Sequence, residues 1–492
     1  MKIINIERFS EVIMKRASGV LMHLSSLHGE YSIGSFGKEA REFIDFLSDS
    51  GFTYWQLLPF CMADSCHSPY KSYSAFAANP LFIDLPTLAK QGLLTYSELE
   101  KAVQNTPYLC EYSRLDKDRL PLLRLAHGRT SKEHREEAHN WILDYPDLCR
   151  AVEFLALKQK NNNLHWREWR DAAPLSEEIS FWEWVQYEFF REWMSVKKYA
   201  NEKGIRVIGD VPIYVADDSC DVWASPDQFQ LDKNLCPIKV AGVPPDYFCE
   251  EGQLWGNPLY DWKRMKSDGY SWWSRRIDYM LTLFDGVRID HFRGLESYWS
   301  VPVTAKSAKE GKWEKGPGRP FIDTLRKIAG NRLIIAEDLG DITPQVEELL
   351  LYSKFPGMRV LQFADPKNSA SPHLPHNYPK NCIAYSGTHD NNTLLGYLFE
   401  MPEEARCRLL SYCNCRSTDW QDICEHIIKT IMASHADTVI FPIQDIFAFG
   451  ADTRMNTPGT AENNWAYRIT HDQLASVDTK KFRFFNELYG RK

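Results

Sequence analysis

Eight short runs of apolar and β-branched residues recur along the chain. They occupy residues 19–23, 53–58, 205–210, 284–290, 332–337, 358–362, 382–386 and 438–442. Short runs that are apolar at successive positions are typical of parallel strands with both faces covered. Helical patterns precede several of the runs. This order of strands and helices predicts an α/β fold, a (β/α)8 TIM barrel.

The clearest helical pattern lies before the third run, between Glu178 and Lys203. Apolar residues recur there at steps of three and four, which places them on one face of a helix. They are Trp182, Val185, Phe189, Trp193 and Val196. We expect this stripe to pack against the core, and Gly204 to end the helix.

The runs are unevenly spaced. The second and third are separated by far more chain than one helix needs. We therefore expect a mainly helical insertion at residues 61–175 and a loop-rich insertion at residues 211–276, after strands two and three. Residues 1–492 are otherwise expected to form one barrel domain, with no separate C-terminal β-sandwich.

Composition excludes several classes of function. The net charge of −8 and the lack of a long basic run argue against nucleic-acid and membrane partners. No signal-like apolar segment opens the chain, so the 12 cysteines are expected to be reduced thiols in a cytoplasmic protein. The 14 histidines include no HExxH motif. Neither a metal nor another cofactor is expected.

Three carboxylates close or follow predicted strands. Asp290 ends the fourth run, Glu337 ends the fifth, and Asp390 follows the seventh. Barrel enzymes place their catalytic groups at the carboxyl ends of the strands. A single acidic residue at such a position is more often a helix cap, but three together favour a catalytic site.

The environment of each carboxylate indicates its chemistry. Side chains alternate along a strand, so Arg288 and Asp290 face the barrel mouth while Val287 and Ile289 face the helices. An adjacent arginine keeps a carboxylate ionised, as a nucleophile requires, although a structural ion pair would look the same. Burial beside Asp290 raises the pKa of Glu337, which suits a proton donor.

Four ordered motifs carry a resemblance to the α-amylase clan. They are GDVPIYV, FDGVRIDHFRG, IIAEDLG and SGTHDNN. Five further segments are similar to the amylomaltases, the 4-α-glucanotransferases or disproportionating enzymes of that clan. They are SPYKSYSAFAANPLFIDL, ADDSCDVWASP, GVPPDYFCEEGQLWGNPLYDW, GKWEKGPGRP and RMNTPGT. The resemblance runs from about Gly19 to Arg468.

This resemblance implies a role for each matched residue. Asp290 would be the nucleophile, Glu337 the general acid/base and Asp390 the transition-state stabiliser, with Arg288 and His389 beside them. Six further residues match positions that line the glucan groove: Tyr70, Asp246, Tyr247, Phe248, Gln253 and Trp255. Four residues depart from the family pattern and bear on glucan-length preference: Lys71, Ala78, Asn392 and Asn463.

The implied reaction transfers α-1,4-glucan segments by a retaining double displacement through a glucosyl-Asp290 intermediate. The expected donors are maltooligosaccharides and starch- or glycogen-type glucans, and the acceptors are glucose or another glucan. Two alternatives stay open: an α-glucan hydrolase with the same carboxylates, and a non-catalytic glucan-binding protein. The three intact carboxylates count against the binding protein.

Overall fold

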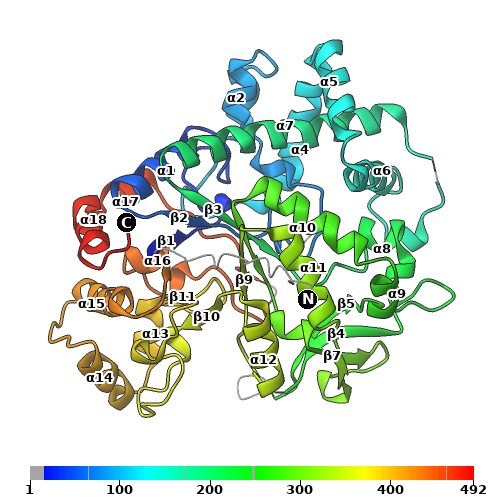
Figure 1. Ribbon diagram of the computed structural model, residues 1–492. Helices are drawn as coiled ribbons and strands as arrows, with labels where there is room; N and C mark the ends of the chain where they lie inside the picture. Colours follow the sequence, from blue (N-terminus) through cyan, green and yellow to red (C-terminus); the bar gives the residue numbers. More distant parts are fainter. Residues whose placement is uncertain (1–15, 65, 172, 246–249, 461) are drawn as a thin grey trace, which may run out of the picture.

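The computed structural model describes residues 16–64, 66–171, 173–245, 250–460 and 462–492, and its centre is a parallel barrel (Figure 1). The eight strands are β1 (Ala17–Leu21), β2 (Tyr54–Gln56), β3 (Arg206–Val211), β6 (Gly286–Ile289), β9 (Leu333–Ala336), β10 (Gly357–Val360), β11 (Cys382–Tyr385) and β12 (Thr438–Pro442). Each overlaps one of the eight apolar runs, so the predicted (β/α)8 barrel is confirmed.

The barrel strands pair in the order β10-β11-β12-β1-β2-β3-β6-β9, and every pair is parallel. The seam between β9 and β10 is bridged by two hydrogen bonds. The Ala336 amide donates to the Pro356 carbonyl at 2.9 Å, and the Met358 amide donates to the Asp338 carboxylate at 2.5 Å. These bonds nearly close the barrel.

Because side chains alternate along each strand, apolar residues fill the barrel interior and polar residues on the same face stand at its mouth. Ile208 and Ile335 belong to the apolar cluster inside the barrel. Two residues further along the same strands, on the same face, stand Asp210 and Glu337. Polar groups thus replace apolar ones where the strands end, and the mouth of the barrel becomes a polar site on an apolar floor.

Further helices lie between and after the barrel strands along the chain. They are α1 (Lys38–Asp49), α10 (Ser271–Leu283), α11 (Arg319–Ala329), α12 (Pro344–Ser353), α13 (Leu394–Glu400), α14 (Glu403–Tyr412), α15 (Trp420–Ala433), α16 (Ile443–Ile446), α17 (His471–Ala475) and α18 (Thr479–Leu488). Along the described residues after β12 the chain has helices and no further strand.

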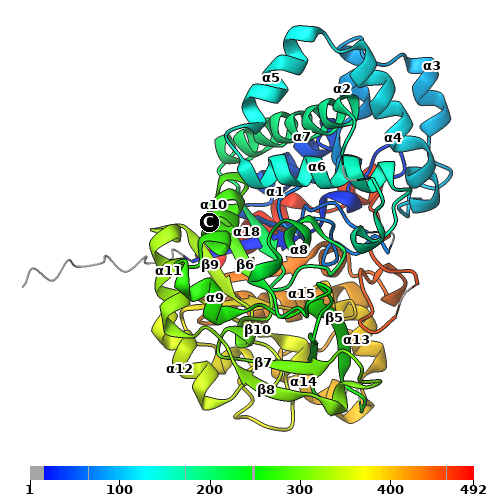
Figure 2. The same cartoon turned by 90° about the vertical axis from the view of Figure 1, so that its right-hand side faces the viewer.

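A group of helices lies between β2 and β3. They are α2 (Leu85–Lys90), α3 (Tyr96–Leu99), α4 (Tyr112–Arg129), α5 (Lys132–Ile142), α6 (Pro146–Lys160) and α7 (Ser176–Glu202). Figure 2 shows them gathered on one side of the barrel. All five apolar residues of the predicted stripe in α7 are buried, and Gly204 follows the helix with φ 81°. Both expectations about this helix are confirmed.

A second, antiparallel sheet lies beside the barrel, which the sequence analysis did not predict. Its strands are β4 (Lys239–Val243), β5 (Gln253–Pro258), β7 (Ser297–Pro302) and β8 (Lys312–Lys315), in the order β5-β4-β7-β8. The two short helices α8 (Cys220–Ala224) and α9 (Trp262–Ser267) flank β4 and β5 in the chain. This sheet brings Gln253 and Trp255 to the barrel mouth.

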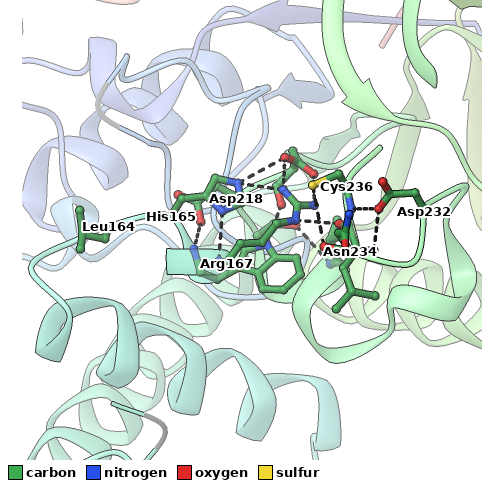
Figure 3. Close-up of polar contacts among 12 residues, drawn as sticks. Leu164, His165, Arg167, Asp218, Asp232, Asn234 and Cys236 are labelled. Atoms are coloured by element: carbon green, nitrogen blue, oxygen red, sulfur yellow. Dashed lines mark hydrogen bonds and ion pairs between the residues drawn. The ribbon is translucent and has the colours of Figure 1, made fainter. Parts of the chain in front are cut away.

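The loop at residues 231–237, which leads into β4, is held by the segment that follows α6 (Figure 3). Arg167 donates from Nε to the Leu235 carbonyl at 2.7 Å and from both terminal nitrogens to Asp217, at 2.6 and 2.7 Å. Inside the loop, Oδ1 of Asp232 accepts the amides of Asn234 and Cys236 at 2.8 and 2.9 Å. The helical group therefore fixes the approach to the second sheet.

Candidate active site

Asp290 and Glu337 stand side by side at the mouth of the barrel. Ile289 of β6 pairs in register with Ala336 of β9, so the next residue of each strand is one of the two carboxylates. The ladder continues past them: the Asp290 amide donates to Val211 at 3.0 Å, and the Glu337 amide donates to Ile289 at 3.1 Å. Strand geometry alone therefore brings these two carboxylates together.

Arg288 joins Asp290 to a further carboxylate, Asp210 at the end of β3. Its Nη1 donates to both oxygens of Asp210, at 2.8 and 2.7 Å, and its Nη2 lies 3.0 Å from Oδ1 of Asp290. Arg288 and Asp210 are buried, whereas the Asp290 side chain is 27% exposed. Arg288 thus binds Asp290 from the buried side, while part of the Asp290 carboxylate stays exposed to the cleft.

Glu337 is buried and accepts two backbone amides. His291 donates to Oε2 at 2.6 Å, and Leu339 donates to Oε1 at 3.0 Å. Burial raises the pKa of Glu337; Arg288 opposes this rise and the charge on Asp290 adds to it. Burial also raises the pKa of Asp290, against the direct ion pair with Arg288, and the rise is smaller. Glu337 is therefore the carboxyl that keeps its proton to higher pH.

Asp390 follows β11 and faces the same cleft with a different environment. His389 Nε2 lies 3.3 Å from Oδ2, and Asn456 donates to Oδ1 at 2.6 Å. Arg454 donates to the Asp390 carbonyl at 2.7 Å. Burial acts to raise the pKa of Asp390, but His389 and Asn456 outweigh it and hold the pKa at about 2. This carboxylate stays charged.

Tyr70 connects the two halves of the site. Its hydroxyl donates to Oδ2 of Asp210 at 2.6 Å, and its ring stacks on His389, with centroids 5.1 Å apart and planes at 16°. The Trp465 ring packs against both the Tyr70 and the His389 rings. A flat apolar face therefore stands beside the charged groups, as sugar binding requires.

Gln253 and Trp255 reach the cleft from β5. Trp255 donates from its indole nitrogen to Gln253 at 3.1 Å, and its ring meets His291 edge to face at 4.9 Å. The other predicted groove residues, Asp246, Tyr247 and Phe248, lie outside the described residues. The structure thus brings together eight of the predicted side chains: Tyr70, Gln253, Trp255, Arg288, Asp290, Glu337, His389 and Asp390.

Four residues of this site were not predicted from the sequence: Asp210, His291, Arg454 and Asn456. Asp210 carried the same signal as the others, because it ends the third apolar run. Asn456 and Arg454 lie in the quoted RMNTPGT segment, and His291 lies in FDGVRIDHFRG. These residues therefore lie in or beside recognisable motifs, but no local sequence pattern predicts which side chains they contact across the barrel.

Of the residues that depart from the family pattern, Asn463 has a physical explanation. Its φ of 61° lies in the left-handed region, which glycine and asparagine adopt more readily than other residues. Lys71 instead forms an ion pair with Asp64 at 3.2 Å, and Asn392 donates to Glu400 at 2.7 Å. Ala78 is buried and its amide donates to Gln186.

Chemically, the site offers a buried proton donor next to an ionised, partly exposed carboxylate and a second permanent negative charge. That set suits displacement at an acetal carbon through an oxocarbenium-like transition state.

Within the described part of the chain, no group of three His, Cys, Asp or Glu side chains is arranged to hold a metal ion. No helix in that part is both long enough and apolar enough to cross a membrane.

Comparisons with known proteins agree with this geometry. A family model described as 4-alpha-glucanotransferase matches residues 22–474. The 4-alpha-glucanotransferase of Clostridium butyricum is 40% identical and aligns over 96% of this chain and 100% of its own. That of Synechocystis sp. is 41% identical, over 97% and 98%. The solved amylomaltase from Streptococcus agalactiae, in complex with acarbose, has a TM-score of 0.93 at 35% identity, covering 97% and 100%.

Proposed function

This chain belongs to the 4-alpha-glucanotransferase family, and from that premise we propose that Asp290, Glu337 and Asp390 carry out its transfer of glucan segments. The single observation that supports this most is the adjacency of a buried Glu337 and an Arg288-paired Asp290 at neighbouring strand ends. A retaining glycoside mechanism needs one acid and one nucleophile on neighbouring positions, with carboxyl groups about 5 to 5.5 Å apart.

In the first step Glu337 donates its proton to the glycosidic oxygen while an oxygen of Asp290 attacks the anomeric carbon. The C–O bond to the leaving segment breaks, its electron pair passes to the protonated oxygen, and a β-glucosyl ester forms on Asp290. Asp390 faces the positive charge that develops on the sugar ring, and its charge persists because His389 and Asn456 hold its pKa at about 2.

In the second step the ionised Glu337 removes a proton from the 4-hydroxyl of an acceptor glucose or glucan. That oxygen attacks the anomeric carbon, the ester bond to Asp290 breaks, and the α configuration is restored. The donors that fit this scheme are maltooligosaccharides and starch- or glycogen-type glucans. Trp255 and Gln253 on β5 offer the acceptor a stacking face and an amide.

Maltotriose provides the test. Transfer redistributes it into longer and shorter oligosaccharides and free glucose at a constant number of reducing ends, whereas hydrolysis adds one end for each bond cut. Asp290→Ala should abolish both outcomes. A product mixture in which reducing ends rise with every bond cut would favour the hydrolase instead.

The role of Glu337 has its own test. Glu337→Gln should lose about 100-fold or more on maltotriose, whose leaving group needs a proton. It should lose far less on α-maltosyl fluoride, because fluoride leaves without one. Equal losses on the two donors would exclude Glu337 as the acid.

A further inference from the structure

His291 lies between the proton donor and the aromatic face of β5, in an unusual backbone conformation. Its φ and ψ are 50° and 51°, the left-handed region that non-glycine residues seldom occupy. This conformation turns the His291 amide onto Oε2 of Glu337 at 2.6 Å. The following amide, of Phe292, donates to the Glu337 carbonyl at 3.0 Å. The turn therefore holds Glu337 by both its side chain and its backbone.

The imidazole ring of the same residue points to the other side. It meets the Trp255 indole edge to face, with centroids 4.9 Å apart and planes at 80°. Gly294 leaves room for the ring: a Cβ there would lie 3.1 Å from Cδ2 of His291 and 2.8 Å from Ile213. Burial, with a contribution from Arg293, lowers the pKa of His291 to about 3, so the ring packs as a neutral group.

We propose that His291 is a positioning residue for both steps of the reaction: its backbone orients Glu337, and its ring holds Trp255 in place for the acceptor. This inference rests on the proposed function, because it takes Glu337 as the acid/base and Trp255 as part of the acceptor site. One residue next to the nucleophile then links proton transfer to acceptor binding.

The ring contact is tested with a double-mutant cycle. His291→Asn removes the ring but keeps the left-handed turn, which asparagine tolerates. It should raise the KM for glucose as acceptor, at saturating maltotriose, by about two- to tenfold, the range of one edge-to-face aromatic contact. Trp255→Ala should raise that KM at least as much. The double variant should match Trp255→Ala alone; effects that multiply would overturn the ring's role.

The backbone contact is tested by comparing His291→Asn with His291→Ala. Both lack the ring, but alanine disfavours the left-handed turn and withdraws the amide from Glu337. Because that amide lowers the pKa of Glu337, its loss should move the alkaline limb of kcat/KM to higher pH in the alanine variant only. Arg288, Asp290 and Asp338 also face Glu337 and are unchanged in both variants.

Identical alkaline limbs in the two variants would overturn the backbone role. His291→Ser, which disfavours the same turn, replaces the alanine variant if that chain does not fold. Glu337→Gln separates this inference from the proposed function. If Glu337→Gln keeps its activity on maltotriose, the proposed function fails; if it loses activity and the His291 variants behave independently, only the inference fails.

Discussion

The guanidinium of Arg288 contacts two carboxylates, Asp210 and Asp290, and the charge of Asp210 affects the pKa of Asp290. Its Nη1 donates to Asp210 and its Nη2 pairs with Asp290. Burial raises the pKa of Asp290, Arg288 lowers it, and the negative charge of Asp210 raises it again. The proton affinity of Asp290, the proposed nucleophile, is therefore set partly by Asp210, which was not among the predicted site residues.

Asp210→Asn should make this dependence visible. Without the charge of Asp210, the pKa of Asp290 falls, so the acid limb of kcat/KM on maltotriose should move to lower pH. The rate at the optimum should also drop, by about 10- to 100-fold, because Arg288 loses the group that orients it. The matched control is Asp341→Asn, which removes a charge from an exposed carboxylate paired with Arg293. An unmoved acid limb in Asp210→Asn would contradict the coupling.

The unmodified enzyme should show a bell-shaped rate against pH. The proposed mechanism needs Asp290 ionised, so activity is lost as the pH falls through its pKa, which burial raises. Glu337 must be protonated, so activity is lost as the pH rises through its pKa, which burial raises further. Asp390, with a pKa of about 2, contributes neither limb. The profile of kcat/KM from about pH 4 to 10 checks this, and a flat alkaline side would exclude Glu337 as the acid.

Among the elements, the loop at residues 231–237 receives a side chain from a distant part of the chain. Arg167 reaches it from the segment after α6, and the ion pair with Asp217 fixes the guanidinium in place. Burial acts to raise the pKa of Asp217, but Arg167 and His165 outweigh it and lower the pKa to about 2. The pair therefore stays charged through the working range of the enzyme.

Arg167→Ala should release this loop without unfolding the barrel. Without the bond from Arg167 to the Leu235 carbonyl, the loop should open more often and expose the amides of Asn234 and Cys236, which now donate to Asp232. Their hydrogen exchange should speed up by about tenfold, the equivalent of one charge-assisted hydrogen bond. Exchange measured by mass spectrometry on the 228–240 region reports this. Arg170→Ala, at an exposed position in the same segment, is the control. Equal protection from hydrogen exchange in the two variants would show that the contacts within the loop keep it folded without Arg167.

The barrel strands were predictable from sequence and the second sheet was not, for a physical reason. Each barrel strand is buried on both faces, which leaves a local apolar run such as Ile334 to Ala336. In contrast, β5 alternates between exposed and partly buried positions and contains Gly256 and Pro258. Its partner β4 in turn pairs with β7, beyond the barrel strand β6. No local sequence pattern predicts pairing between strands that are separated by a barrel strand in the chain.

The same distinction applies to the site. Asp290 and Glu337 were found because each ends its own apolar run. Their partners come from elsewhere: Asn456 from beyond β12, Tyr70 from beyond β2, and Trp255 from the second sheet. The sequence therefore identifies the candidate reacting groups, whereas the contacts that set their pKa values are visible only in the folded barrel.

At the scale of the whole molecule, Arg491 secures the end of the barrel opposite the cleft. Its side chain is fully buried and donates to the carbonyls of Ala17, Ala436 and Asp437, at 3.1, 3.1 and 3.4 Å. It also donates to Met432 and Ser434, at the end of α15 and after it. One side chain thus satisfies the backbone where β1 and β12 begin.

Arg491→Ala should lower the free energy of unfolding by about 2 to 4 kcal/mol, because the buried carbonyls of Ala17 and Ala436 lose their side-chain donor, while Arg16 still donates to those of Met432 and Ser434. The midpoint of urea unfolding measures this. Turnover per folded molecule on maltotriose should stay unchanged, since the cleft lies at the other end of the strands. Lys492→Ala, next in the chain and exposed, is the control. Lost turnover at full stability would contradict this assignment.

The pairing of β1 with β12, from Ala17 with Thr438 to Leu21 with Pro442, also affects how the protein is made. A ribosome synthesises β1 first, and its partner β12 emerges only after every other strand of the described residues. During this interval one edge of β1 has no neighbour, and an unpaired edge invites pairing with another nascent chain. Barrel closure must therefore follow translation of β12, and the growing polypeptide is most exposed to aggregation, and most in need of chaperones, before that point.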